Sequence, residues 1–458
     1  MSMETNIKKN IDAEQYIVTR NACKLCTPLG ATLAFRGIEG TIPFLHGSQG
    51  CATYIRRYMI SHFREPMDIA SSSFTETSAI FGGRSNLHTG IKNVIKQYHP
   101  KLVGIASTCL SETIGDDINS YIRELEKDQE LADTKLVTVS TPSYRGTHAE
   151  GFFHTVRETV KKLATGGEKN KSVNLIPNMV SPADIRYLRE ILTDFDLPHV
   201  LLPDYSDTLD GTTWNEYQKI PRGGTPVESI AGMGAAVGTI EFISTFNPEM
   251  TAGYVLNSAF NVPNHQIPMP VGIRQTDAFF NLVSLYASAP VPEKHSMERG
   301  RLIDSYVDAH KYIFGKKAVL YGEQELVIPL AAFLAEIGMI PVVCASGART
   351  GKMRDKIVQS VPQFEEKIEV LEAADFIAIE ELAKKHGADI LLGSSKANKM
   401  ARSLNIPLVR IGFPVHDRFG AARNLHLGYR GTQQLFDRIV NAILEDRQKK
   451  SPVGYFYM

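Results

Sequence analysis

Three of the five cysteines stand in short polar or glycine-bearing stretches near the start of the chain. They are Cys26 in Cys-Lys-Leu-Cys-Thr-Pro-Leu-Gly, Cys51 in His-Gly-Ser-Gln-Gly-Cys, and Cys109 in Ser-Thr-Cys-Leu-Ser-Glu-Thr. Such turns can present a thiolate, which is the ligand that holds iron–sulfur clusters. These three cysteines are therefore the candidate metal ligands. Cys344, inside the apolar run Ile-Pro-Val-Val-Cys-Ala, is expected to be a buried core residue.

Spacing alone leaves the kind of site open. The three candidates are too far apart in sequence for a compact ferredoxin or zinc motif, so they can meet only through the fold. Cys23 and Cys26 have the C-x2-C spacing of a zinc knuckle, but no second Cys or His pair follows at the expected distance. A nucleophilic cysteine also stays open, because the sequence identifies no histidine partner for any of them.

Composition excludes several classes of protein. The chain has 458 residues, of which 43% are hydrophobic and 22% charged, as in an ordinary globular protein of two to four domains. Fifty basic residues balance fifty acidic ones, without the clustered positive charge that nucleic acids and membrane surfaces attract. No signal-peptide core and no run of about 18 apolar residues occurs. We therefore predict a cytoplasmic protein with no nucleic-acid and no membrane partner.

Short apolar runs alternate with amphipathic helical stretches beyond the first 20 residues. Unbroken apolar runs bounded by Gly, Pro or Ser are typical of parallel strands buried on both faces. The expected strands are 101–106, 135–140, 172–176, 199–202, 317–321, 340–344, 389–392 and 407–411. Between them, residues 181–193 predict a helix, with Ser181 as N-cap and Pro182 in its first turn. The pattern predicts an α/β fold with Rossmann-like parallel sheets flanked by helices, whose ligands bind beyond the strand ends.

Two composition shifts predict the domain organisation. Residues 165–171 are charged and glycine-rich, and residues 289–294 contain two prolines before a new helix. We expect an N-terminal arm and three α/β domains, at residues 1–20, 21–168, 169–293 and 294–458. The first of these domains carries all the candidate ligands.

Motifs spread along nearly the whole chain form a recognisable set, most specific in the N-terminal third. They are Cys-Thr-Pro-Leu-Gly-Ala (26–31), His-Gly-Ser-Gln-Gly-Cys (46–51), His-Phe-Arg-Glu-Pro (62–66), Ser-Ser-Ser-Phe-Thr-Glu (71–76), Ile-Phe-Gly-Gly (80–83), Ser-Thr-Cys-Leu-Ser-Glu-Thr-Ile-Gly-Asp-Asp (107–117), Thr-Pro-Ser-Tyr (141–144), Val-Arg-Ile-Gly-Phe-Pro-Val-His-Asp-Arg (409–418) and Leu-Gly-Tyr-Arg-Gly-Thr (427–432). In this order they closely resemble the β-type subunits of nitrogenase component 1.

The resemblance implies an iron–sulfur cluster shared with an α-type partner. In the catalytic β subunit of the family, three cysteines hold half of an [8Fe-7S] P-cluster, and the matching positions here are Cys26, Cys51 and Cys109. Ser143 matches a serine whose oxygen joins the cluster on oxidation, since a deprotonated hydroxyl is a hard ligand. A scaffold subunit of the family would hold a simpler [4Fe-4S] cluster at this place.

Two further positions match roles outside the cluster. Phe81 corresponds to an aromatic residue on the face that docks an ATP-hydrolysing iron protein, and Tyr54 to a tyrosine near the electron path. The chain has no phosphate-binding G-x-x-x-x-G-K-[ST] loop. It also lacks the cofactor-ligating Cys and His of an α-type subunit in their family contexts. ATP hydrolysis and substrate reduction are therefore expected on partners, the iron protein and an α-type subunit in an α2β2 heterotetramer.

Within the family, two roles compete. Residues 209–211, 223–225 and 428–432 are similar to the scaffold subunit on which the iron-molybdenum cofactor is assembled. The complete set of Cys26, Cys51, Cys109 and Ser143 favours an electron relay in a nitrogenase or a nitrogenase-like reductase, such as a methylthio-alkane reductase. We predict the relay, because a complete ligand set is needed when the cluster changes redox state. A binding module that has the fold without the cluster is the non-enzyme alternative.

Overall fold

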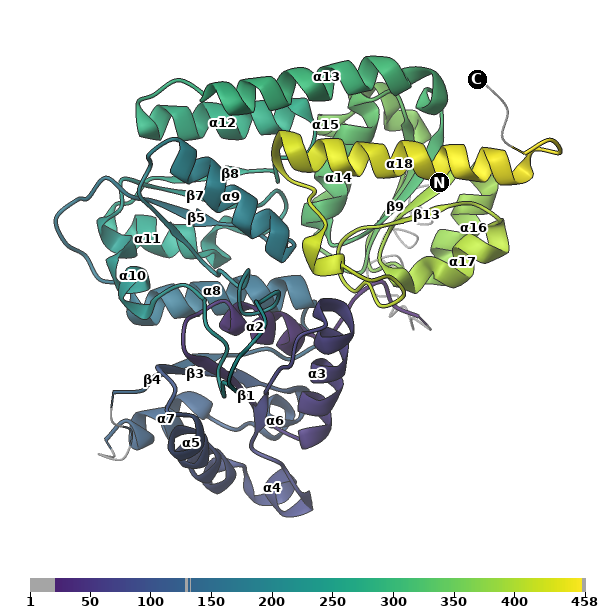
Figure 1. The fold of residues 1–458 in the computed structure, drawn as a ribbon. Coiled ribbons are helices and arrows are strands. Elements are labelled where there is room, and N and C mark those ends of the chain that lie inside the picture. Colours follow the sequence, from purple (N-terminus) through teal and green to yellow (C-terminus); the bar gives the residue numbers. More distant parts are fainter. Residues whose placement is uncertain (1–20, 128–130, 132, 455–458) are drawn as a thin grey trace, which may run out of the picture.

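The computed structural model describes residues 21–127, 131 and 133–454, and its strands form three parallel sheets. Each sheet lies in its own lobe with helices packed around it (Figure 1). The predicted α/β class with parallel sheets and flanking helices is confirmed. The predicted N-terminal arm lies outside the described residues.

The first sheet has the strand order β2-β1-β3-β4. Its strands are β1 (Thr41–His46), β2 (Ala70–Ser71), β3 (Leu102–Ser107) and β4 (Lys135–Val139). Its helices are α2 (Thr27–Arg36), α3 (Gln49–Phe63), α4 (Glu76–Phe81), α5 (Arg84–Tyr98), α6 (Cys109–Ile114), α7 (Ile118–Leu125) and α8 (His148–Leu163). From β1 the chain passes to the edge strand β2 and then returns to β3, so the connections diverge between β1 and β3. Open parallel sheets bind ligands at such a switch point.

The second and third sheets have the orders β6-β5-β7-β8 and β11-β10-β9-β12-β13. The second contains β5 (Val173–Ile176), β6 (His199–Leu201), β7 (Gly238–Phe242) and β8 (Asn264–Ile267), with α9 (Pro182–Asp194), α10 (Val227–Ala231), η2 (Gly232–Ala235), η3 (Pro248–Met250), α11 (Ala252–Phe260) and α12 (Ile273–Ala287). The third contains β9 (Lys317–Gly322), β10 (Ile340–Ser346), β11 (Glu369–Leu371), β12 (Ile390–Gly393) and β13 (Leu408–Arg410), with α13 (Glu293–Ile313), α14 (Gln324–Glu336), α15 (Met353–Ser360), η4 (Pro362–Lys367), α16 (Phe376–His386), η5 (Ser395–Ala397), α17 (Asn398–Leu404), η6 (Ala421–Arg423) and α18 (Gly428–Lys450).

All eight strands expected from apolar runs coincide with strands of the structure, and two central strands were not expected. β1 contains Pro43, which lacks an N–H group; its partner on one side is the two-residue β2, which pairs only with Phe44 and Leu45. β7 contains Glu241, which is buried and accepts a hydrogen bond from the Gly253 amide at 2.7 Å. Pro43 and Glu241 interrupt the apolar runs in the sequence, so the two strands were not expected, but neither residue interrupts the strand itself.

The expected helix at residues 181–193 is α9. Ser181 caps its first turn, because its hydroxyl accepts from the Asp184 amide at 2.9 Å while the Asp184 carboxylate accepts from the Ser181 amide. Such a capping box satisfies amides that the helix itself leaves unpaired.

One core cluster is common to all three lobes, and the first and third lobes each have a further cluster of their own. A single cluster of buried apolar side chains runs from α2 through the second sheet to α18, and α18 lies alongside α13 across the top of the molecule (Figure 1). Glu325 of α14 links the third lobe to the second by hydrogen bonds, since its buried carboxylate accepts from the Thr245 and Phe246 amides beyond β7. The domain boundaries stay a prediction. In the described part of the chain, no helix is long and apolar enough to cross a membrane.

Helix α2 is buried along its whole length and packs against α8 through two glycines. A Cβ on Gly30 would lie 1.7 Å from the His148 carbonyl oxygen, and a Cβ on Gly151 would lie 2.0 Å from the Thr27 carbonyl oxygen. The two backbones are therefore in direct contact, and neither position has room for a side chain. This contact determines where the N-terminus of α2 lies.

Replacing Gly151 with alanine should destabilise the fold by about 3 kcal/mol, because the methyl group meets backbone that cannot move aside. Thermal or urea unfolding measures the change. Gly300→Ala is the matched control: Gly300 is an exposed residue of α13, nothing lies within 4 Å of its Cβ position, and alanine there should add about 0.5–1 kcal/mol of helix stability. Equal effects of the two substitutions would contradict the close packing of α2 on α8.

His62 is buried at the inner end of α3 among aromatic rings. Its ring centroid lies 4.5 Å from that of Phe63 and 4.7 Å from that of Phe413, and its Nδ1 accepts from the Val415 amide at 2.9 Å. Burial, with smaller effects of His416 and His426, lowers the pKa of His62 to about 3. His62 is therefore neutral in the folded protein throughout the physiological range.

The buried neutral His62 should make the fold less stable in acid. The unfolded chain binds a proton at this position below about pH 6.5, whereas the folded chain does so only near pH 3. Protonation between these values favours unfolding, and by pH 5 this one group should cost about 2 kcal/mol. His62→Gln preserves an acceptor for Val415 and does not titrate, so its loss of stability from pH 7 to pH 5 in urea titrations should be smaller by that amount. An identical pH dependence would refute the assignment.

Candidate metal centre

The three candidate ligands all lie where helices begin, and all three are exposed. Cys26 is the N-cap of α2, Cys51 lies in the first turn of α3, and Cys109 is the first residue of α6. By contrast, Cys23 and Cys344 are buried, which confirms the core position expected for Cys344.

Adjacent strand ends bring Cys51 and Cys109 together. The last residue of β1, His46, is paired in register with the last residue of β3, Ser107, so the loops that follow leave the sheet side by side. A Cβ on Gly47 would lie 2.1 Å from Thr108 Oγ1, and Thr108 Oγ1 donates to the His46 carbonyl at 3.0 Å. Glycine at position 47 thus allows the two cysteine-bearing loops to touch.

Ser143 joins the group from the next strand, β4. Its backbone N–H donates to Cys109 Sγ at 3.2 Å, and its hydroxyl oxygen accepts from the Thr27 amide at 3.3 Å. One serine therefore links the sulfur of Cys109 to the residue after Cys26. The structure brings together all four residues that the sequence motifs indicated.

The electrostatics of the group suit a bound cation. Burial raises the pKa of the Cys51 thiol, and the neighbouring Cys26 and Cys109 raise it further, so the thiols destabilise one another's charge. A metal at this place would relieve that repulsion. Lys396 of η5 adds a positive charge behind Cys26, with its Nζ donating to the Lys24 carbonyl at 3.2 Å. Burial lowers the pKa of Lys396, and the nearby Cys23 and Cys26 oppose that effect.

His148 of α8 holds the segment before Cys26 in place. Its Nδ1 accepts from the Leu25 amide at 3.3 Å, and its Nε2 lies 3.1 Å from Glu323 Oε1. Burial lowers the pKa of His148 to about 3, so the ring is neutral and can accept from Leu25. The cysteine is thus positioned by α8 and by the third lobe together.

The three thiols lie near one another without forming a compact single-ion site in the described part of the chain. In the described residues, no three Cys, His, Asp or Glu side chains lie close enough to hold one metal ion. The exposed thiols of Cys26 and Cys109 are nevertheless close enough to Cys51 to raise its pKa. Cys23 does not contribute, because it packs in the core of the third lobe and burial raises its pKa to about 12. The C-x2-C pair is therefore not a zinc knuckle.

Comparison with known proteins identifies the family. A family model described as nitrogenase component 1 type oxidoreductase matches residues 26–444. The chain belongs to this family. It is 36% identical to the nitrogenase molybdenum-iron protein beta chain of Clostridium pasteurianum over 433 residues, 94% of each chain. It is 36% identical to the nitrogenase vanadium-iron protein beta chain of Trichormus variabilis over 437 residues, 93% of this chain and 94% of that one.

A solved structure, nitrogenase Cp1 at pH 6.5, matches with a TM-score of 0.94 and 35% identity over 97% of both chains. The chain is therefore a β-type subunit of the nitrogenase component 1 oxidoreductases, as its motifs predicted.

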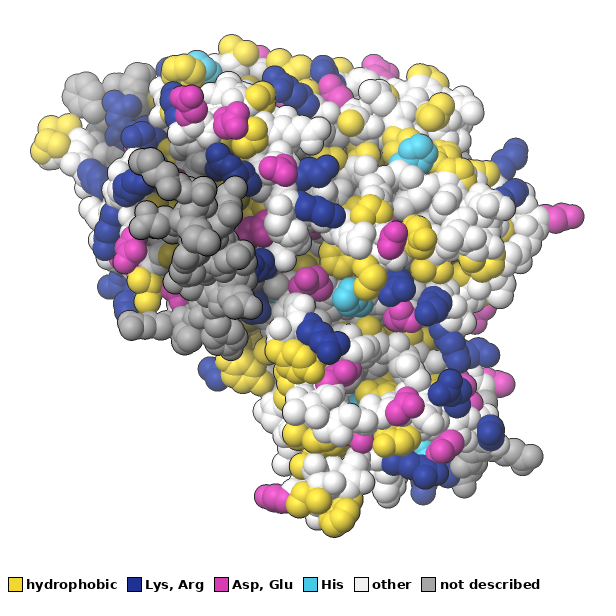
Figure 2. Space-filling view, turned by 180° about the vertical axis from the view of Figure 1, so that it is seen from behind, with side chains coloured by type: hydrophobic (Ala, Val, Ile, Leu, Met, Phe, Trp, Pro, Cys, Tyr) yellow, Lys and Arg dark blue, Asp and Glu magenta, His cyan; other side chains and the backbone are white. Residues whose placement is uncertain are grey.

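Tyr54 and Phe81 lie outside the ligand group. Tyr54 is on α3, one turn beyond Cys51; it is exposed, and its hydroxyl lies 3.3 Å from that of Tyr58. Phe81 ends α4 and is 81% exposed, next to Ile80, which is 74% exposed. Hydrophobic side chains colour the lower tip of the molecule yellow (Figure 2), the end at which α4 lies in Figure 1. Two large apolar side chains at a tip are unusual unless a partner covers them.

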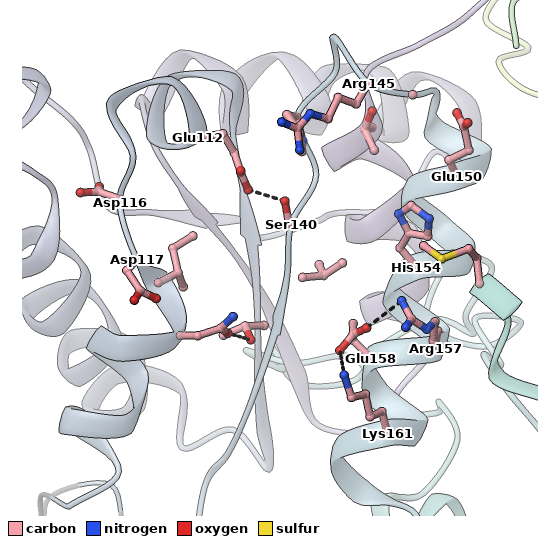
Figure 3. A pocket seen from close by; sticks show the side chains of 18 residues that line it. Glu112, Asp116, Asp117, Ser140, Arg145, Glu150, His154, Arg157, Glu158 and Lys161 are labelled. Atoms are coloured by element: carbon pink, nitrogen blue, oxygen red, sulfur yellow. Dashed lines mark hydrogen bonds and ion pairs between the residues drawn. The ribbon is translucent and has the colours of Figure 1, made fainter. Parts of the chain in front are cut away.

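The sequence motifs did not single out the acidic residues that hold this site together. Glu112 accepts from the hydroxyls of Ser107 and Ser140, which ties the ends of β3 and β4 to each other. It also lines a cavity of about 600 Å³ beside the edge strand β4. In Figure 3 the acidic Glu112 and Asp117 face Arg145 and the α8 residue His154 across this cavity. A short Ser-to-Glu spacing is common in loops, so only the fold reveals the role of Glu112.

The metal-free chain should contain three reactive thiols and two protected ones. Iodoacetamide labelling of the native chain, mapped by mass spectrometry, should modify Cys26, Cys51 and Cys109, because they are exposed, whereas Cys23 and Cys344 should react only after unfolding. Fast labelling of Cys344 in the native chain would contradict the structure.

Proposed function

We propose that this chain is the electron-relay β-type subunit of a nitrogenase or nitrogenase-like reductase. Its Cys26, Cys51 and Cys109 would hold half of a P-cluster-type [8Fe-7S] cluster, shared with an α-type partner in an α2β2 heterotetramer of the cytoplasm. The observation that carries the proposal is the convergence of three exposed thiols and Ser143 on the ends of β1, β3 and β4, in a chain of this family.

The residues of this chain provide binding and positioning. When bound, an iron–sulfur cluster supplies one-electron redox chemistry. The half-buried Lys396 compensates negative charge behind the site. The Ser143 hydroxyl would be the oxygen donor available in an oxidised state, because the backbone N–H of the same residue already contacts Cys109 Sγ.

Electrons would enter from an iron protein that docks at the exposed α4 tip. Ile80 and Phe81 offer that partner an apolar contact, and Tyr54, one turn beyond Cys51, would lie near the path toward the α-type partner. ATP hydrolysis would take place on the iron protein, and the substrate would be reduced at the cofactor of the α-type subunit. These two partners supply the activities for which this sequence has no motif.

Iron content tests the ligand set. The complex would be purified anaerobically with its α-type partner, and Cys51→Ala should remove interfacial iron, because one of three thiolate ligands from this chain is lost. Cys344→Ala is the control, since Cys344 is buried in the third sheet and its removal should leave the iron count unchanged. Full iron content in the Cys51 variant would exclude that residue from the ligand set.

Redox-dependent EPR of the same samples separates the relay from the scaffold. The relay requires a cluster of eight irons whose signal changes on oxidation, and Ser143→Ala should alter the oxidised signal while leaving the reduced iron count intact. A four-iron cluster with an unchanged number of irons on oxidation would replace the relay by the scaffold function. A colourless, iron-free complex would leave only a binding module.

A further inference from the structure

The buried carboxylate of Asp116 is hydrogen-bonded to several segments of the chain close to the exposed end of α4. Its side chain is only 3% exposed, and it is the second residue after α6 in the chain. It accepts from the Gly83 amide at 3.0 and 3.2 Å, from the Tyr121 hydroxyl at 3.3 Å, and lies 3.0 Å from His46 Nε2. Gly83 is the second residue after Phe81. The position of the α4 end is therefore fixed by a carboxylate from the loop after α6.

His46 continues this connection to the loop that presents Cys51. A carboxylate only accepts, so Nε2 of the neutral ring carries the proton and Nδ1 accepts from the Ser72 hydroxyl at 3.1 Å. Ser72 in turn accepts from the Gly47 amide at 2.8 Å. His46 is fully buried, and its ring packs edge-on against Phe74 at 4.8 Å. Both ring nitrogens of His46 are thus hydrogen-bonded, Nε2 to Asp116 and Nδ1 to Ser72.

The same histidine also holds the Cys109 loop. Its backbone carbonyl accepts from Thr108 Oγ1, and Thr108 caps the short helix that Cys109 begins. The ring of Phe74 and the carboxylate of Asp116 fill the space where a Cβ of Gly83 would lie, at 2.2 and 2.8 Å. Gly83, Asp116 and His46 are therefore closely packed against one another. A displacement of one must move the others or leave a buried charge without its partners, which is costly.

We propose that the His46–Asp116 pair is a positioning link. It transmits a shift caused by a partner at the exposed end of α4, at Phe81, to the backbone segments that carry Cys51 and Cys109. A protein partner that presses on Phe81 would shift Gly83, and the pair would pass that shift to Gly47 and Thr108. The link rests on the proposed function, because it assumes that the iron protein docks at α4. It goes further by assigning a coupling role to two residues that touch neither the partner nor a thiol.

Hydrogen–deuterium exchange on the assembled complex with its α-type partner tests the link without measuring activity. In the wild type, iron protein held by a non-hydrolysable ATP analogue should slow exchange at residues 76–84, and also at 46–52 and 107–113. Asp116→Asn keeps the shape but has one acceptor oxygen instead of two, so His46 or Gly83 loses its partner. This variant should show the slowing at 76–84 and lose it at 46–52 and 107–113. Its free-state exchange at 46–52 should be about tenfold faster, as expected for the loss of one charge-assisted hydrogen bond.

Asp117→Asn is the matched control, because it makes the same chemical change at the next residue. Asp117 is the N-cap of α7 and accepts from the Ser120 amide, and asparagine serves equally well there. The control should behave as the wild type. If Asp116→Asn does not assemble, Ser72→Ala removes the next hydroxyl in the path and should give the same loss of transmitted slowing.

The outcomes separate the two proposals. Slowing confined to 76–84 in the wild type would overturn the link and leave iron protein docking intact. Absence of slowing at 76–84 in the wild type would overturn docking at α4, and the link with it. Transmitted slowing that survives in both Asp116→Asn and Ser72→Ala would show that another route carries it and would also overturn the link.

Discussion

The close contact between α2 and α8 is the constraint on which the candidate metal centre depends. Gly30 and Gly151 let the two backbones touch, so the start of α2 has a single possible position relative to the first sheet. That position places Cys26 at the helix N-cap and the Thr27 amide on the Ser143 hydroxyl. With a larger residue at either glycine, the helix would move away from the strand ends, and Cys26 would no longer face the other two thiols.

The other two ligands follow from the topology of the first sheet. Cys51 and Cys109 lie on loops that leave β1 and β3 at the point where the chain reverses its direction across the sheet, which is where parallel sheets present ligands. The third lobe completes the site from the opposite side. The Cys23 amide donates to the Ala374 carbonyl at 2.9 Å, and Lys396 binds the carbonyl of Lys24. The segment before Cys26 therefore bridges two lobes.

Burial distinguishes core cysteines from candidate ligands even where they are neighbours in the sequence. Cys23 and Cys26 are three positions apart, yet one packs in the core of the third lobe and the other is exposed at the N-cap of the buried helix α2. The proposed electron relay would need both properties: a rigid buried frame, so that the candidate ligands do not rearrange, and exposed thiols, so that a partner could share a cluster. The exposed apolar α4 tip is a second surface of this kind, separate from the thiols and linked to them by the His46–Asp116 pair.

The amino-acid sequence by itself determined the fold class, most of the strands, the family and the four candidate ligands, because apolar periodicity and local motifs are short-range properties. It also separated Cys344 from the exposed cysteines through its apolar neighbours. Only the tertiary structure decided that Cys26, Cys51, Cys109 and Ser143 meet, since their approach depends on strand order and on the α2–α8 contact. The roles of Glu112, Asp116 and His46 likewise became visible only in three dimensions, because each connects segments that the sequence keeps apart.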